Sequence, residues 1–113
     1  MDLEIKSFDG EGYMPLIGCR GWRVALINSC ENLLEKNLKK LERHFSSDEA
    51  FVLIEGDAVL FIGKEMKRYP MEKCKVYNIK REVWHCIALG EKSKVVVVES
   101  DDVCEKNSDI YFL

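Results

Sequence analysis

Short apolar segments rich in β-branched and aromatic residues recur along this chain, and each is too short to form a stable helix. Turn-forming residues separate them, at positions 55–57, 63–70 and 89–91. Short strands joined by short turns are typical of an antiparallel sandwich or barrel, so the pattern predicts an all-β fold. The predicted strands cover residues 22–27, 50–54, 58–62, 76–79, 83–89 and 95–99.

Two of these predicted strands are apolar on both faces. Residues 51–54 read Phe-Val-Leu-Ile, and residues 95–98 are consecutive valines. A strand at the surface of a small domain normally alternates apolar and polar side chains, because only one face is buried. A second layer or a second copy of the chain must therefore cover the outer face, and we expect a homodimer.

One segment supports two interpretations. Leucines at positions 33, 34, 38 and 41, followed by Phe45, lie close to a helical stripe, and Ser29 is a suitable N-cap. Taken alone, residues 31–43 therefore favour a helix as strongly as a strand. We expect at most one short helix, near residues 31–40.

The composition restricts the functions that this domain can have. A chain of 113 residues is the size of one domain, spanning 1–113. It has 17 Lys and Arg against 20 Asp and Glu, a net charge of -3, so it lacks the basic excess of a nucleic-acid-binding protein. No apolar run is long enough to span a membrane, and the acidic, polar residues 1–11 exclude a secretory signal peptide. The expected partner is a small molecule.

The five cysteines indicate a reducing compartment. They are widely spaced, odd in number and without a Cys-x-x-Cys pair. Such a pattern is typical neither of a disulfide framework nor of a structural zinc site. We therefore expect a cytoplasmic protein.

The chemistry of the chain concentrates around its two histidines, His44 and His85. A lone histidine on a strand is more often a packed or solvated residue than a ligand. Two histidines and one glutamate are nevertheless a minimal ligand set for a divalent metal, with water in the remaining positions. Strand alternation places Glu42 on the same face as His44, and a turn after His44 can direct Glu49 to that face.

The stretch from Glu42 to Gly56 resembles the first motif of the cupins. That motif reads His-x-His, three or four residues, Glu, six residues and Gly, and His44, Glu49 and Gly56 match it. Residues 76–85 resemble the second motif, in which a Pro-x-Gly turn precedes a histidine, here His85. The resemblance to the cupins covers residues 41–99. The tract that ends in Trp84-His85 and is followed by an apolar strand is also similar to small single-domain cupins grouped loosely with ureidoglycolate lyases.

The resemblance implies a double-stranded β-helix, a small jelly-roll barrel that often pairs through its outer strands. It also implies a strand from about Leu38 onward, where the apolar pattern alone leaves a helix open. Its ligand set implies that His44, Glu49 and His85 hold a divalent metal such as Mn, Fe, Ni or Zn.

The chain departs from the cupin motifs at several positions. Glu42 replaces the first histidine of the first motif, which favours manganese or iron over zinc because a carboxylate is a harder ligand. Lys80 and Glu82 replace the proline and glycine of the second motif, so the turn need not hold His85 in the same pose. Leu89 stands where an asparagine is expected.

Two functions remain open. The first is a metal-dependent lyase or isomerase acting on a small polar metabolite, such as a hydroxy acid, a ureido acid or a sugar. In that enzyme Glu42 is either a fourth ligand or a general base. The second is a metal-free cupin that binds a sugar or an organic acid at the mouth of the barrel, without catalysis.

Overall fold

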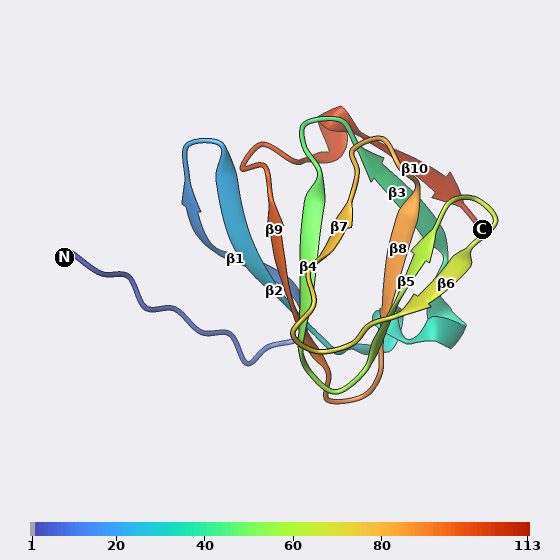
Figure 1. The fold of residues 1–113 in the computed structure, drawn as a ribbon, viewed down its shortest axis with the longest axis horizontal. Coiled ribbons are helices and arrows are strands. Elements are labelled where there is room, and N and C mark those ends of the chain that lie inside the picture. Colours follow the sequence, from blue (N-terminus) through green and yellow to red (C-terminus); the bar gives the residue numbers. More distant parts are fainter. Residues whose placement is uncertain (1) are drawn as a thin grey trace.

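The computed structural model describes residues 2–113, and strands dominate this part of the chain (Figure 1). The only helices described are three single turns of 3₁₀ helix, and none is long and apolar enough to cross a membrane. The 3₁₀ turns are η1 (Glu31–Leu33), η2 (Glu35–Asn37) and η3 (Glu105–Asn107). The strands are β1 (Gly12–Cys19), β2 (Trp22–Asn28), β3 (Lys40–His44), β4 (Glu49–Glu55), β5 (Ala58–Ile62), β6 (Lys67–Pro70), β7 (Tyr77–Ile79), β8 (His85–Leu89), β9 (Lys94–Glu99) and β10 (Ser108–Phe112).

The strands form two antiparallel sheets, which face each other in a jelly-roll arrangement (Figure 1). One sheet, which we call sheet A, has the order β1-β2-β9-β4-β7, and the other, sheet B, has the order β10-β3-β8-β5-β6. Strands far apart in the sequence are neighbours, since β9 lies between β2 and β4, and β3 lies between β10 and β8. The all-β, double-stranded β-helix prediction is confirmed.

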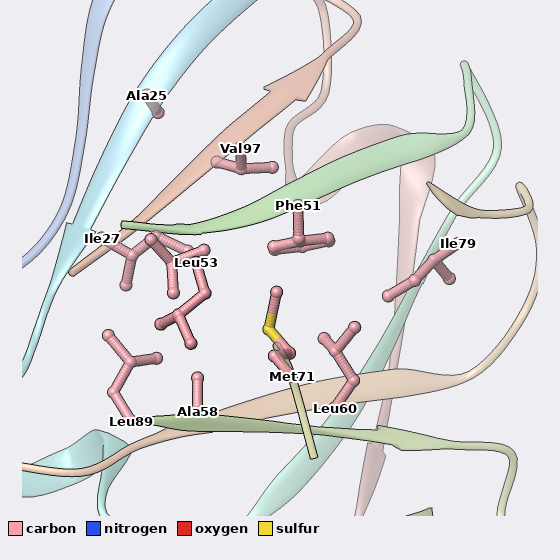
Figure 2. Close-up of a cluster of buried hydrophobic side chains, with 11 residues drawn as sticks. Ala25, Ile27, Phe51, Leu53, Ala58, Leu60, Met71, Ile79, Leu89 and Val97 are labelled. Atoms are coloured by element: carbon pink, nitrogen blue, oxygen red, sulfur yellow. The ribbon is translucent and has the colours of Figure 1, made fainter. Parts of the chain in front are cut away.

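The core lies between the two sheets (Figure 2). Strand alternation sends every second side chain inward, so Phe51 and Leu53 of β4 face Ala58 and Leu60 of β5. Buried Met71, which follows β6, fills the space between them. Burial of these apolar side chains is the main favourable term holding the sheets together.

All six predicted strands are present, with boundaries that differ by at most two residues. β1, β6 and β10 were missed, and the turn predicted at 63–70 was wrong beyond residue 66, where β6 pairs with β5. All residues of β6 are exposed, and two of them are Lys67 and Arg68. Charged side chains and a terminal proline are common on edge strands, because they discourage pairing with another chain. From sequence such a strand is hard to distinguish from a loop.

The helix considered for residues 31–43 was wrong, and the strand expected from about Leu38 is confirmed as β3. The short helix expected near 31–40 is present only as η1 and η2. Leu34 and Leu38 adopt extended backbone angles that end these turns. β3 pairs along its length with β10 and through Glu42 with β8, so sheet pairing and the burial of Leu41 override the local helical pattern.

The turn between β4 and β5 requires its glycine. Gly56 has a φ of +74°, and a Cβ atom built there lies 2.8 Å from the Cα of Ser93. The Ser93 hydroxyl accepts a hydrogen bond from the amide of Asp57, which fixes the same turn. Only glycine combines this backbone angle with so close an approach.

Gly56→Ala is therefore expected to lower the free energy of unfolding by at least about 2 kcal/mol, because left-handed strain adds to the clash with Ser93. Urea denaturation measures the change. Gly21→Ala is the matched control, since Gly21 has a φ of +88° but open space around its Cβ position. Equal losses in the two variants would show that the contact with Ser93 does not matter.

Candidate metal centre

Three strand ends bring His44, Glu49 and His85 together inside the fold. His44 is the last residue of β3, Glu49 the first of β4 and His85 the first of β8. β3 and β8 are neighbours in sheet B, whereas β4 belongs to sheet A, so the group bridges the two sheets. One ligand atom from each residue lies within 4.8 Å of the other two.

The three side chains are buried and converge on one carboxylate oxygen. Their exposed fractions are 8% for His44, 5% for Glu49 and 7% for His85. Glu49 Oε1 lies 3.2 Å from His44 Nε2 and 2.9 Å from His85 Nε2. Neither contact has hydrogen-bond geometry, so this buried oxygen has no hydrogen-bond partner among the described residues. Buried polar atoms are rarely left unpaired, which indicates that something else binds there.

The outer nitrogens of both rings are fixed by the surrounding protein. His85 Nδ1 lies 3.0 Å from the carbonyl oxygen of Val83, which can only accept, so Nδ1 carries the proton and Nε2 of the neutral ring keeps a free lone pair. His44 Nδ1 lies 2.6 Å from the hydroxyl of Ser108 on β10. Such contacts orient metal-ligating histidines in other proteins.

The electrostatics of the group favour a cation. Burial raises the pKa of the Glu49 carboxyl, His85 opposes this shift and Glu99 adds to it, and the net pKa is about 7. Burial and the nearby His85 lower the pKa of His44. Burial also lowers the pKa of His85, but the Glu49 carboxylate outweighs this effect and raises it. A divalent cation would stabilise the carboxylate together with two neutral rings, so these residues fit a metal ion.

Glu42 lies beside the group rather than within it. It is opposite His85 in the pairing of β3 with β8, and its Oε2 is 3.7 Å from His44 Nε2. Its other oxygen is 3.2 Å from Lys40 Nζ, and its side chain is 39% exposed. Glu42 is therefore placed at the wall of the site and not among its three converging donors.

A cavity of about 790 Å³ opens over these residues. A second polar group, Tyr13, Arg23 and Glu99, also lines it. The Tyr13 hydroxyl donates to Glu99 Oε2 at 2.6 Å, and Arg23 Nε donates to the same oxygen at 2.8 Å. The Glu99 side chain is 4% exposed, and Glu99 and Glu49 each shift the pKa of the other, so this second group acts electrostatically on the candidate ligand Glu49.

Sequence reasoning did not find this second group. One signal was available: Glu99 lies two residues after Val97 on β9 and therefore on the same inward face. An acidic residue at an inward position of an apolar strand needs a partner. The identity of that partner, Arg23, is not visible in the local sequence.

No protein-family model and no curated protein matches this chain. Solved structures do match. A cupin-2 domain protein from Shewanella frigidimarina superposes with a TM-score of 0.63 at 16% identity, covering 82% of this chain and 84% of its own. A cupin superfamily protein from Desulfitobacterium hafniense gives 0.61 at 15% identity, covering 87% and 84%.

The chain has a cupin fold.

A cupin-fold enzyme matches as well. HppE, solved with iron(II) and substrate, superposes with a TM-score of 0.64 at 13% identity, covering 77% of this chain and 52% of its own. This chain therefore spans about half the length of HppE. Another structure of HppE contains cobalt(II). At these identities the likeness establishes the shared fold.

The second cupin motif keeps its turn although it lacks the proline and glycine. Glu82, at the glycine position, adopts a φ of +70°, the left-handed angle that glycine favours. Its amide donates to the carbonyl oxygen of His44 at 2.8 Å, and the amide of Val83 donates to that of Lys80. The backbone before His85 is thus held in place without the motif residues. Leu89, at the asparagine position, is buried in the core.

Proposed function

We propose that this protein is a metal-dependent enzyme of the cupin type, in which His44, Glu49 and His85 hold one divalent cation. The observation that carries the proposal is the buried, unpartnered Glu49 Oε1 between two imidazole nitrogens. The cupin-fold enzyme HppE, solved with iron(II) or cobalt(II), supports a metal in this fold. Two imidazoles and one carboxylate with open positions are a common iron(II) ligand set, so we expect iron or manganese, with nickel and zinc as the other metals to test for.

The bound cation would polarise a carbonyl or carboxylate oxygen of a small molecule. The protein's own residues would orient the site and move protons. His85 donates from Nδ1 to Val83 and so keeps the lone pair of Nε2 free, and Ser108 orients the ring of His44. Glu42 lines the cavity outside the group of three, and its partly exposed carboxylate suits a general base that removes a proton beside the polarised group.

Such a base beside a Lewis acid suits a lyase or an isomerase. The resemblance to cupins grouped with ureidoglycolate lyases points to the same reaction classes, with a hydroxy acid, a ureido acid or a sugar as substrate. Glu42 as general base and these substrates are parts of the proposal.

The test is the metal content of untagged protein, purified without chelator and without a nickel column. We expect about one equivalent of iron or manganese per chain. A metal-free protein whose melting temperature does not respond to added divalent ions would contradict the proposal. That outcome would favour the metal-free cupin that binds an organic acid or a sugar.

We also propose that the protein pairs as a homodimer through the outer face of sheet A. Cross-strand neighbours on this face form an apolar row, Leu26 beside Val96 beside Val52. At one end of the face Val98 is 39% exposed. A contiguous apolar sheet face is typical of an interface between protein chains.

Val98→Lys is expected to convert the dimer into a monomer, because a charge would be buried at the interface. Light scattering coupled to size exclusion measures the mass. Tyr69→Lys is the matched control, since Tyr69 is also 39% exposed but lies on β6 in sheet B. A wild-type protein that is already monomeric at high concentration would contradict the dimer.

A further inference from the structure

The cavity over the candidate metal ligands has apolar walls. Ile27, Phe51 and Val97 from sheet A line it, together with Leu33 of η1 and Ile87 of β8. The Phe51 ring lies 6.4 Å from the His85 ring, centroid to centroid, so the apolar wall begins directly at the candidate metal site.

The last strand extends this wall outward. Ile110 and Phe112 of β10 also line the cavity, yet these residues are 46% and 74% exposed. Large apolar side chains that line a cavity and remain exposed gain free energy when an apolar ligand covers them.

Most polar side chains of the cavity are already paired. Arg23 and Tyr13 bind Glu99, and Lys40 binds Glu42. Apart from Glu49 in the candidate metal site, Asn32, Lys39 and Glu105 are the exceptions, with no side-chain partner in residues 2–113. A sugar needs a polar partner for each buried hydroxyl group, and these walls offer few.

The volume excludes a close fit to the smallest acids. At about 790 Å³ the cavity is in the upper part of the range for pockets that bury drug-sized ligands. A two- or three-carbon acid held at the metal would leave Leu33, Ile110 and Phe112 without contacts.

We propose that the substrate has an oxygen-chelating head and an apolar chain: a hydroxy or oxo acid whose aliphatic or aromatic chain lies along Phe51, Ile87, Ile110 and Phe112. This inference rests on the proposed metal site and narrows its substrate from small polar metabolites to amphiphilic acids. The head binds where Glu49 Oε1 lacks a partner, and the chain covers the apolar wall.

Alkyl hydroxamates test the inference, because their two oxygens chelate a metal and their chain length can be varied alone. Affinities of acetohydroxamate, butanohydroxamate, hexanohydroxamate and octanohydroxamate are measured by calorimetry on the metal-loaded protein. We expect affinity to rise about threefold to fourfold per methylene until the wall is covered, which corresponds to about 0.8 kcal/mol per buried CH₂.

The outcomes separate the two proposals. Hydroxamates that all bind with equal affinity would leave the metal site standing and overturn the amphiphilic substrate. A protein that loads no metal and binds no hydroxamate would overturn both. An affinity that falls with chain length would also overturn the amphiphilic substrate, since it would mean that the walls reject an apolar chain.

Phe112→Ser provides the second measurement, since this exposed side chain can be removed without opening the core. We expect octanohydroxamate to bind at least about threefold more weakly, the equivalent of about one lost methylene contact, with acetohydroxamate unchanged. Val76→Ser is the matched control, because Val76 is 69% exposed but does not line the cavity. Equal effects of the two substitutions would contradict a chain lying along β10.

Discussion

Glu49→Gln is expected to lower the affinity for the divalent cation more than about 100-fold, because loss of even an outer-shell partner of a metal site typically costs about 10- to 100-fold. Glutamine keeps the shape of the side chain and removes its negative charge. Glu49 supplies the only carboxylate among the three converging donors, so the remaining two neutral imidazoles cannot balance a divalent charge.

The variant should fold, because the group that it removes is a poorly satisfied one. Glu49 is 5% exposed, its Oε1 lacks a hydrogen-bond partner, and Glu99 is a second acidic group beside it. Replacing a buried carboxyl by a neutral amide removes a desolvation cost. We therefore expect metal-free Glu49→Gln to be at least as stable as metal-free wild type in urea denaturation.

Metal titration monitored by thermal melting measures the loss. Wild type should gain about 2.7 kcal/mol of stability at a free metal concentration 100 times its dissociation constant, and the variant should gain at most about 0.4 kcal/mol at that concentration. Glu55→Gln is the control, since Glu55 ends the same strand in an exposed position. Glu42→Gln should retain the metal, because Glu42 lies outside the group of three. Retention of a full equivalent by Glu49→Gln would contradict the proposed site.

The strand pattern, together with the resemblance to cupin motifs, was sufficient to predict most of this fold and the residues that meet at the candidate metal site. Residues 95–98 and 51–54 are apolar on both faces and form adjacent strands in sheet A, whose inner face is buried in the core. His44, Glu49 and His85 could be grouped because the resemblance to cupin motifs supplies contacts between distant residues. Their role as metal ligands stays a prediction.

What the sequence could not provide is pairing between distant segments that have no motif. Tyr13 and Glu99 are 86 positions apart, and Arg23 and Glu99 are 76 apart, so no local pattern connects them. β10 was missed for the same reason, because this strand forms by pairing with β3, which is distant in the sequence. Its residues Ile110 and Phe112 remain exposed, so no core contact marks the strand. Residues 31–43 were ambiguous because local helical propensity competed with sheet pairing, and only the tertiary contacts decide.

Arg23→Met is expected to lower the free energy of unfolding by about 3 kcal/mol at pH 7, because breaking a buried ion pair leaves a buried charge without compensation. Glu99 is 4% exposed at its side chain and Arg23 is 21% exposed. Arg23 also donates to the carbonyl oxygen of Val103, so its removal leaves a second acceptor unpaired. Methionine keeps the apolar stem, which isolates the loss of the guanidinium group.

The loss should depend on pH with a definite sign. Burial raises the pKa of Glu99, but the effects of Glu49, Tyr13 and Arg23 together outweigh burial and lower the pKa below the usual 4.5. A lowered folded-state pKa contributes stability above pH 4.5 that is lost as the pH falls through the folded value. Without Arg23 much of this contribution is absent, so the difference between wild type and Arg23→Met should shrink as the pH is lowered below 4.5.

Urea denaturation of chelator-treated protein at several pH values measures this difference without any contribution from metal. Arg68→Met is the matched control, because Arg68 forms a similar pair with Glu35 that is half exposed on both sides. Exposed pairs contribute little to stability, so this variant should leave the unfolding midpoint nearly unchanged. If Arg23→Met and Arg68→Met both left the free energy of unfolding nearly unchanged, Glu99 would have to be neutral in the folded protein. Glu49 would then have no charged carboxylate of Glu99 beside it.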